Sequence, residues 1–240
     1  MLALTVAGAE GCRTSAGLPA DTGSGARAGQ LLVPDENGRI DRSTSGSTGI
    51  QGHWFAAADT DACQKDGNHV ARECSFFVSP DPRAPNFQRT GDLGMCTVGG
   101  AAKVLARPDG NIDWANMWGA RIGVTLSDDG PYDALAHGVT GFAFHMDAEP
   151  PPNTGLRVEL FTLATSGSPA VWGGPAADTS PVHAGHNEFR WTEVGGPAFL
   201  NNPPPFDPTQ LLSIAFTVPS SPSGPKSFSF CISQLAALEY

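Results

Sequence analysis

The sequence predicts an all-β protein, a two-sheet antiparallel β-sandwich with jelly-roll topology. The 240-residue chain holds 29 glycines and 21 prolines but only 16% charged residues, a mixture that suits many short strands joined by Gly/Pro loops. Hydrophobic residues make up 40% of the chain, which excludes wholesale disorder. Most apolar runs alternate with a two-residue period, and no run of ten or more residues shows a convincing helical stripe.

The expected elements follow one another from residue 31. An Asn-Gly turn separates two short extended pieces in 31–44, and 49–59 brings Trp54 and Phe55 as core candidates. Further strand-and-loop units cover 67–81 and 94–111. Asp207 and Pro208 predict one helical turn, as N-cap and first helical residue. Six strand-length runs, most of them separated by proline-rich breaks, complete the pattern: 119–126, 139–148, 156–165, 187–194, 211–218 and 227–238.

The chain divides into a residual signal or lipoprotein-type N-terminus with a flexible linker, 1–30, and a single β-sandwich domain, 31–240. The start resembles the end of a bacterial lipoprotein signal, in which lipid is attached to a cysteine, although Glu10 in "AEGC" departs from that pattern. Cys12 is therefore either a lipidation site or incidental. With a lipid anchor or a cleaved signal, the protein would be extracytoplasmic, either a cell-surface or outer-membrane lipoprotein or a secreted protein.

The four remaining cysteines suit two disulfides. Four cysteines permit three pairings, of which we favour Cys63 with Cys74, closing a polar loop, and Cys96 with Cys231, tying an early strand to the last one. Four reduced, buried cysteines are the alternative.

The net charge of −10 and the pI near 4.9 argue against a nucleic-acid partner, because no basic stripe is present to meet a phosphate backbone. The same charge disfavours electrostatic docking on anionic lipid, so a membrane contact would come only through the N-terminal lipid. The oligomeric state stays open.

Side-chain parity along the strands separates two faces. Arg121, His145, Arg157 and Glu159 are expected to share an outer face, where polar residues are the default in any sandwich. The opposite face carries an apolar set large enough for the core between the sheets: Ile122, Val124, Phe142, Phe144, Met146, Val158, Leu160, Ile214, Phe216, Val218, Phe228, Phe230 and Ile232.

The series "WGARIGVTL … YDALAHGVTGFAFHMDA … LRVELFTL … FDPTQLLSIAFTV … FSFCISQLAAL" resembles the galactose-binding-like jelly roll. That group includes carbohydrate-binding modules and domains related to complex I intermediate-associated protein 30. The resemblance spans roughly Asn37 to Leu238 and rests on strand order and a "YDA…GFxF" pattern. It implies that the outer face of one sheet is concave and serves as a ligand groove.

Aromatic residues near that face are candidates for stacking on a sugar ring, with Arg121, His145, Arg157 and Glu159 bonding its hydroxyls. Trp172, flanked by two glycines in a loop, is the strongest single candidate. Trp118, Trp114 and Tyr132 are the others. Trp54 and Trp191 are expected to close the ends of the sandwich, and for Trp118 this role is the alternative to ligand stacking.

No cofactor is expected, apart from a structural calcium that the resemblance implies. Asp35, Asn37 and Asp41, with Glu36, would supply oxygen ligands, but the last strand lacks the acid that such sites use. His183 and His186 form an isolated H-x-x-H that we interpret as solvated.

No catalytic motif is found, and a glycosidase needs two facing carboxylates. The leading hypothesis is a non-catalytic carbohydrate-binding module. A surface-structural or adhesion protein, whose outer sheet is a protein interface, is the alternative, and a hydrolase using Glu159 is the least favoured.

Overall fold

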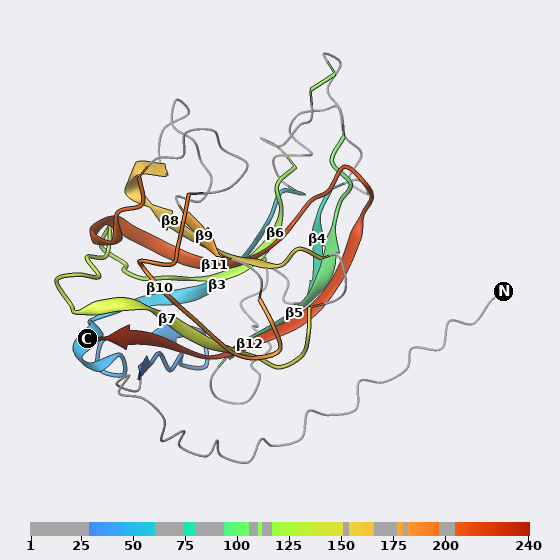
Figure 1. Ribbon diagram of the computed structural model, residues 1–240. Coiled ribbons are helices and arrows are strands. Elements are labelled where there is room, and N and C mark those ends of the chain that lie inside the picture. The colour runs from blue at the N-terminus through green and yellow to red at the C-terminus, as the bar shows by residue number, and fades with distance from the viewer. Residues whose placement is uncertain are drawn as a thin grey trace.

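The computed structural model describes residues 29–60, 74–79, 94–105, 110–111, 117–150, 154–165, 177–179, 182–196 and 205–240. Within these residues the chain forms two antiparallel sheets of six strands each, which face one another as two layers (Figure 1). The first sheet has the order β10-β7-β12-β5-β4, with β1 also pairing with β12, and the second has the order β2-β3-β6-β11-β8-β9. The strands are β1 (Gln30–Leu31), β2 (Arg39–Ile40), β3 (Gly52–Ala58), β4 (Phe76–Ser79), β5 (Gly94–Ala101), β6 (Gly119–Thr125), β7 (Val139–Met146), β8 (Arg157–Thr162), β9 (Ala177–Thr179), β10 (Gly185–Arg190), β11 (Leu211–Pro219) and β12 (Lys226–Glu239).

The main strands alternate between the two sheets along the chain. β5, β7, β10 and β12 belong to the first sheet, whereas β6, β8 and β11 belong to the second, so nearly every connection from β5 onward crosses from one layer to the other. This crossing is characteristic of a jelly roll and differs from a meander, in which consecutive strands pair. The predicted all-β, two-sheet jelly-roll class is confirmed.

Short 3-10 turns interrupt the strands: η1 (Gly46–Thr48), η3 (Leu163–Thr165) and η4 (Pro208–Gln210). The turn predicted from Asp207 and Pro208 is η4, in which the Asp207 carboxylate accepts a hydrogen bond from the Thr209 amide at 2.9 Å. No helix among the described residues is long and apolar enough to cross a membrane.

The core lies between the sheets and consists of the side chains that parity predicted. Each member of that apolar set is buried. Trp54 from β3 is 2% exposed and stacks on Phe216, which in turn meets the edge of Phe144 from the opposite sheet at 4.9 Å between ring centroids. Trp54 is thus a core residue, as predicted, while Trp191 packs partly buried against the same cluster.

β12 changes face part-way along its length. Phe228, Phe230 and Ile232 point into the core, and after Gln234 the inward positions become Leu235 and Ala237. The pairing with β7 shifts register between Ser233 and Ala236, and Gln234 has a φ of 52°. An extra residue in one strand moves the following side chains to the other face, so this bulge keeps both halves of the strand amphipathic.

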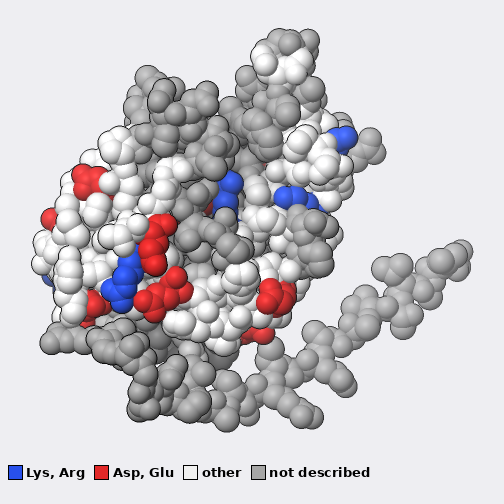
Figure 2. Space-filling model, viewed as in Figure 1, with Lys and Arg blue, Asp and Glu red and all other residues white. Residues whose placement is uncertain are grey.

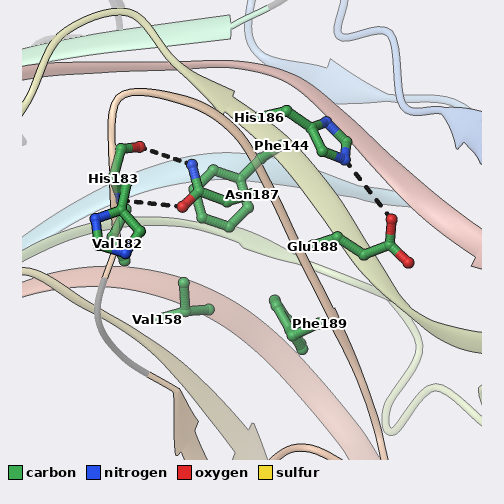
Figure 3. Close-up of a pocket in the computed structure, with 8 residues that line it drawn as sticks. All are labelled: Phe144, Val158, Val182, His183, His186, Asn187, Glu188 and Phe189. Atoms are coloured by element: carbon green, nitrogen blue, oxygen red, sulfur yellow. Dashed lines mark hydrogen bonds and ion pairs between the residues drawn. The ribbon is translucent and has the colours of Figure 1, made fainter. Parts of the chain in front are cut away.

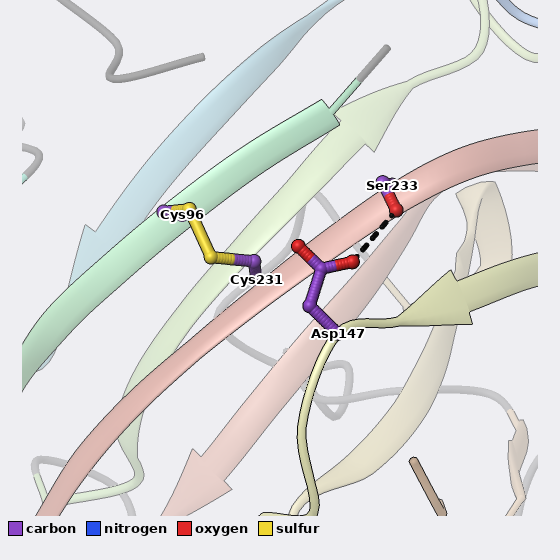
Figure 4. The surroundings of a disulfide bond; sticks show 4 residues. All are labelled: Cys96, Asp147, Cys231 and Ser233. Carbon is purple, nitrogen blue, oxygen red and sulfur yellow. Dashed lines mark hydrogen bonds between the residues drawn. A yellow bond between two sulfur atoms is a disulfide. The ribbon is translucent and has the colours of Figure 1, made fainter. Parts of the chain in front are cut away.

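A disulfide joins β5 to β12 (Figure 4). Cys96 and Cys231 are directly opposite in the register, with Cα atoms 4.0 Å apart and a separation of 135 residues along the chain. This confirms the predicted pair. Cys74 is also disulfide-bonded. Its predicted partner Cys63 lies outside the described residues, as does Cys12, so that pairing and the lipidation stay predictions, together with the division into 1–30 and 31–240.

Candidate functional site

Four of the predicted site residues lie together on the second sheet. Arg121 belongs to β6, with Trp118 directly before that strand, and Arg157 and Glu159 belong to β8. β11 runs between them and places Thr217 opposite both arginines. Their side chains lie on the face of the sheet turned away from the core, here called the outer face of the second sheet. The parity prediction is correct for these residues because β6 and β8 flank the same central strand.

Glu159 is the centre of this group and is almost completely buried, with 1% of its surface exposed. One carboxylate oxygen, Oε1, accepts hydrogen bonds from Arg157, at 2.8 Å from Nε and 2.6 Å from Nη2. The other, Oε2, accepts a hydrogen bond from the Thr217 hydroxyl at 2.6 Å and lies 3.6 Å from Nη1 of Arg121. Two guanidinium groups and a hydroxyl therefore surround one carboxylate, which meets the rule that buried charges are paired.

The Arg121 guanidinium links this charged group to the aromatic residues. Its central carbon lies 3.8 Å from the centre of the Trp118 ring and 4.7 Å from the centre of the Phe161 ring. Burial lowers the pKa of Arg121, and the neighbouring Glu159 carboxylate opposes that shift. Such cation–π contacts strengthen when the cation is removed from water. Arg121 is thus held by Glu159 and supports the Trp118 ring.

The backbone at Trp118 is also anchored, by a second buried carboxylate. Asp59 accepts hydrogen bonds from the backbone amides of Gly119 and Ser75, each at 2.8 Å. Burial raises the pKa of Asp59, and these amide hydrogen bonds act against the increase. Gly119 has a φ of 118°, and a Cβ there would lie 2.2 Å from the carbonyl oxygen of Val218, so no other residue fits. The Trp118 carbonyl accepts a hydrogen bond from the Ser220 amide.

Small residues occupy the centre of this face. Gly123 on β6 and Ala215 on β11 pair with each other, and Ala215 is also paired with Glu159. The Phe55 ring lies across Gly123, where an added Cβ would meet it at 2.7 Å. The prediction of Phe55 as a core residue is therefore wrong. Phe55 is only partly buried and lies on the outer face of the second sheet, because it follows the inward-pointing Trp54 and adjacent residues of a strand point to opposite faces.

His145 does not lie with the other polar residues, contrary to the prediction of one shared face. It belongs to β7, which pairs with β10 and β12 in the first sheet. Parity states only that a side chain points away from the core, and a sandwich has two such faces. Because consecutive strands alternate between the sheets, His145 and Arg121 lie on opposite sides of the molecule.

Tyr132 is not available as a groove residue. It is 4% exposed, joins the main core cluster, and donates a hydrogen bond from its hydroxyl to the Thr48 carbonyl at 2.5 Å. Burial raises the pKa of this phenol well above its ordinary value. The backbone of Tyr132 is also bridged to Leu211 at the start of β11.

The proposed calcium ligands are used in local turns. One oxygen of Asp35 accepts hydrogen bonds from the amides of Asn37 and Arg39, and Asp41 accepts one from the amide of Ser43. The Ser43 hydrogen bonds lower the pKa of Asp41. Among the described residues, no group of three or more His, Cys, Asp or Glu side chains is arranged to hold a metal ion. Asp35 shapes the predicted Asn-Gly turn, and Asp41 shapes the turn that follows β2.

Two predicted aromatic ligands, Trp114 and Trp172, lie outside the described residues. The structure adds three groups that sequence reasoning missed: Phe161, Thr217 and Asp59. Phe161 and Thr217 share parity with Glu159 and Arg121 in strands that were predicted. Parity therefore indicated that they point away from the core, but only the order of the strands shows that they meet Arg121 and Glu159. Asp59 had no such signal, since its partners Ser75, Gly119 and Ser220 come from three separate segments.

A separate hollow of about 230 Å³ lies beside the edge strand β10 (Figure 3). Phe144, Val158 and Phe189 line its buried side. At its rim the Asn187 amide is fully engaged, accepting from the His183 amide and donating to the His183 and Gly185 carbonyls. Charged groups on the face in view form small clusters on a mostly uncharged surface, the largest near β7 and β10 (Figure 2).

No protein-family model matches the chain, and no curated protein matches it. Among solved structures, the chain is similar to the family 11 carbohydrate-binding module of the cellulosomal cellulase Lic26A-Cel5E of Clostridium thermocellum, with a TM-score of 0.37 and 14% sequence identity over 69% of this chain and 81% of that one.

Proposed function

We propose that the protein is a non-catalytic carbohydrate-binding module that stacks a sugar ring on Trp118. The observation that carries this proposal is that the Arg121 guanidinium holds the Trp118 ring in place. Trp118 is partly exposed, and the Arg121 guanidinium lies 3.8 Å from its centre, held there by the buried Glu159. An aromatic plane fixed in this way offers a preorganised surface, and preorganisation reduces the free-energy cost of binding.

The chemistry of the surrounding face favours a neutral ligand. A sugar ring has an apolar C–H side that stacks on an aromatic plane, and hydroxyls that need polar partners. The Glu159 carboxylate is already bonded to Arg157 and Thr217. Nε of Arg121 is buried and has no hydrogen-bond partner in the described part of the chain. A buried donor without a partner is unfavourable, and a ligand hydroxyl would satisfy it only if Arg121 moved to expose this nitrogen.

The same contacts argue against hydrolysis by Glu159. A glycosidase uses a pair of carboxyl groups on either side of the scissile bond, one of which donates a proton. Glu159 is enclosed by two arginines and a threonine, and Asp59, the other buried carboxylate near Arg121, bonds backbone amides. Neither group is placed to meet a sugar directly. An extracytoplasmic setting is part of the proposal, supported by the Cys96–Cys231 disulfide.

Binding should be measured on a glycan array and then by calorimetry with neutral gluco-, manno-, galacto- and xylo-oligosaccharides. We expect Trp118→Ala to weaken binding roughly tenfold or more, because an aromatic contact contributes about 0.5–1.5 kcal/mol beyond its buried area. Trp118→Phe should retain part of the affinity. Phe76→Ala is the matched control, since Phe76 is an exposed aromatic residue of the first sheet.

A wild-type protein that binds no glycan would overturn the proposal and favour the adhesion hypothesis. Unchanged affinity in Trp118→Ala would remove Trp118 as the platform. In that case Trp172→Ala is the next variant to measure, because the sequence makes Trp172 the strongest single candidate for stacking on a sugar.

A further inference from the structure

Two histidines lie side by side on the outer face of the first sheet, far from the Trp118 site. His145 on β7 and His186 on β10 are direct partners in the antiparallel register. Their neighbours Phe144 and Phe189 point into the core, so the two imidazoles extend from the opposite side of the sheet. Residues directly opposite in an antiparallel pair have Cβ atoms about 4.5–5.5 Å apart. Two imidazoles at this separation can reach a single ion.

Neither ring is committed to the interior. His145 is partly exposed, and its ring has no hydrogen bond or ion pair in the described part of the chain. The His186 side chain is 68% exposed. Figure 3 shows His186 and Glu188 on the side of β10 opposite Asn187 and Phe189, pointing toward each other at the edge of the hollow that they help to line.

Glu188 orients one of the two rings. Its Oε2 lies 3.6 Å from Nε2 of His186, so the carboxylate stands on the Nε2 side of the ring and Nδ1 is the nitrogen left to bind an ion. A carboxylate that holds the non-ligating nitrogen of a histidine is the usual partner of a metal-binding imidazole. Arg190 contacts the other Glu188 oxygen at 3.3 Å and steadies that carboxylate.

We propose that His145 and His186 form a two-histidine site for a divalent transition metal ion such as Cu²⁺, Ni²⁺ or Zn²⁺. Imidazole nitrogen suits these ions, whereas Ca²⁺ and Mg²⁺ prefer oxygen. No third His, Cys, Asp or Glu converges with them among the described residues, so water completes the coordination. The site is independent of the proposed carbohydrate binding.

Calorimetric titration of the full chain with Cu²⁺, Ni²⁺ and Zn²⁺ near neutral pH tests the proposal. We expect one ion per chain at this site, with Cu²⁺ the tightest, in line with the general affinity order of these metals. His145→Ala and His186→Ala should each weaken binding by about tenfold or more. Glu188→Gln should weaken it less than either, because Glu188 acts through His186. Both histidines are on the surface, so the variants should fold normally.

His183→Ala is the matched control, since His183 is an exposed histidine three residues from His186. The His183→Ala variant should bind each metal ion with the affinity of the wild type. The electron paramagnetic resonance spectrum of Cu²⁺ bound to the wild type should show two nitrogen ligands. Absence of binding to the wild type would overturn the proposal. An unchanged affinity in His145→Ala, with one nitrogen ligand in the spectrum, would do the same, because His186 would then act alone.

Discussion

Replacing Glu159 by Gln should be among the most destabilising substitutions on the surface side of this sandwich. The change keeps the size and shape of the side chain but removes its negative charge. Glu159 is buried, and Arg157 and Arg121 place their guanidinium groups at 2.6 and 3.6 Å from its oxygens. Without the carboxylate, two positive charges face each other in a site that water barely reaches.

The expected loss of unfolding free energy is about 3–5 kcal/mol, the range found when one partner of a buried ion pair is removed. The arginine side chains are only 14% and 22% exposed, so solvent screens the remaining charges weakly. For a chain of this size, each kcal/mol lowers Tm by roughly 2–4 °C. Glu159→Gln should therefore lower Tm by about 6–20 °C.

Urea unfolding at neutral pH, followed by tryptophan fluorescence, measures this loss. Glu188→Gln is the control, because the Glu188 pairs with His186 and Arg190 are exposed and contribute about 1 kcal/mol or less. A loss in Glu159→Gln no larger than in this control would refute the stabilising role of the buried ion pairs. A loss that salt reverses would do the same, since a buried pair should respond little to ionic strength.

Three further predictions concern the supports of the fold. Replacing Cys96 and Cys231 together by Ser should lower the free energy of unfolding by about 4–5 kcal/mol, since the bond closes a 135-residue separation, and denaturant curves of the double variant against the wild type check this value. Asp59→Ala should cost about 2–6 kcal/mol, because it leaves the buried Ser75 and Gly119 amides without an acceptor, and a stability unchanged from the wild type would contradict that role. Burial raises the pKa of Asp59 in the folded protein above that of an ordinary aspartate. The stabilisation from its protonation is therefore complete below the pKa of the unfolded chain and is lost as pH rises through the folded-state pKa. Asp59→Asn should lack this part of the pH dependence when unfolding is followed across the acid range.

Much of the fold was predictable because the sandwich is encoded locally. The two-residue period of 119–126 and 211–218 placed Ile122 and Phe216 in the core, and both are buried. The Asp207–Pro208 turn was readable for the same reason, since an N-cap residue followed by proline is a local signature. The Cys96–Cys231 pair is 135 residues apart and was favoured as one of three possible pairings. The switch at Gln234 was not readable, because a bulge depends on how the partner strand is paired.

The candidate site was predictable only in part. Arg121, Arg157 and Glu159 were correctly grouped, since they share a parity in strands that prove to be neighbours of β11. Trp118 lies before β6 and joins them through its contact with the Arg121 guanidinium. His145 was grouped with them in error, and Tyr132 was expected at a groove although it lies in the core. The two errors have different causes. For His145, parity reports inward or outward and does not say which sheet the strand joins. Tyr132 lies outside the predicted strands, where parity carries no information on burial.

The sequence by itself therefore determined the class of fold, the core side of each strand and the residue types available for binding, because alternation along a strand is a property of the local backbone. Only the tertiary structure decided that Glu159 is enclosed by two arginines, that Arg121 supports Trp118, and that His145 stands beside His186 on the opposite sheet. Those relations depend on which strands lie next to each other, and in a jelly roll neighbouring strands are distant in sequence.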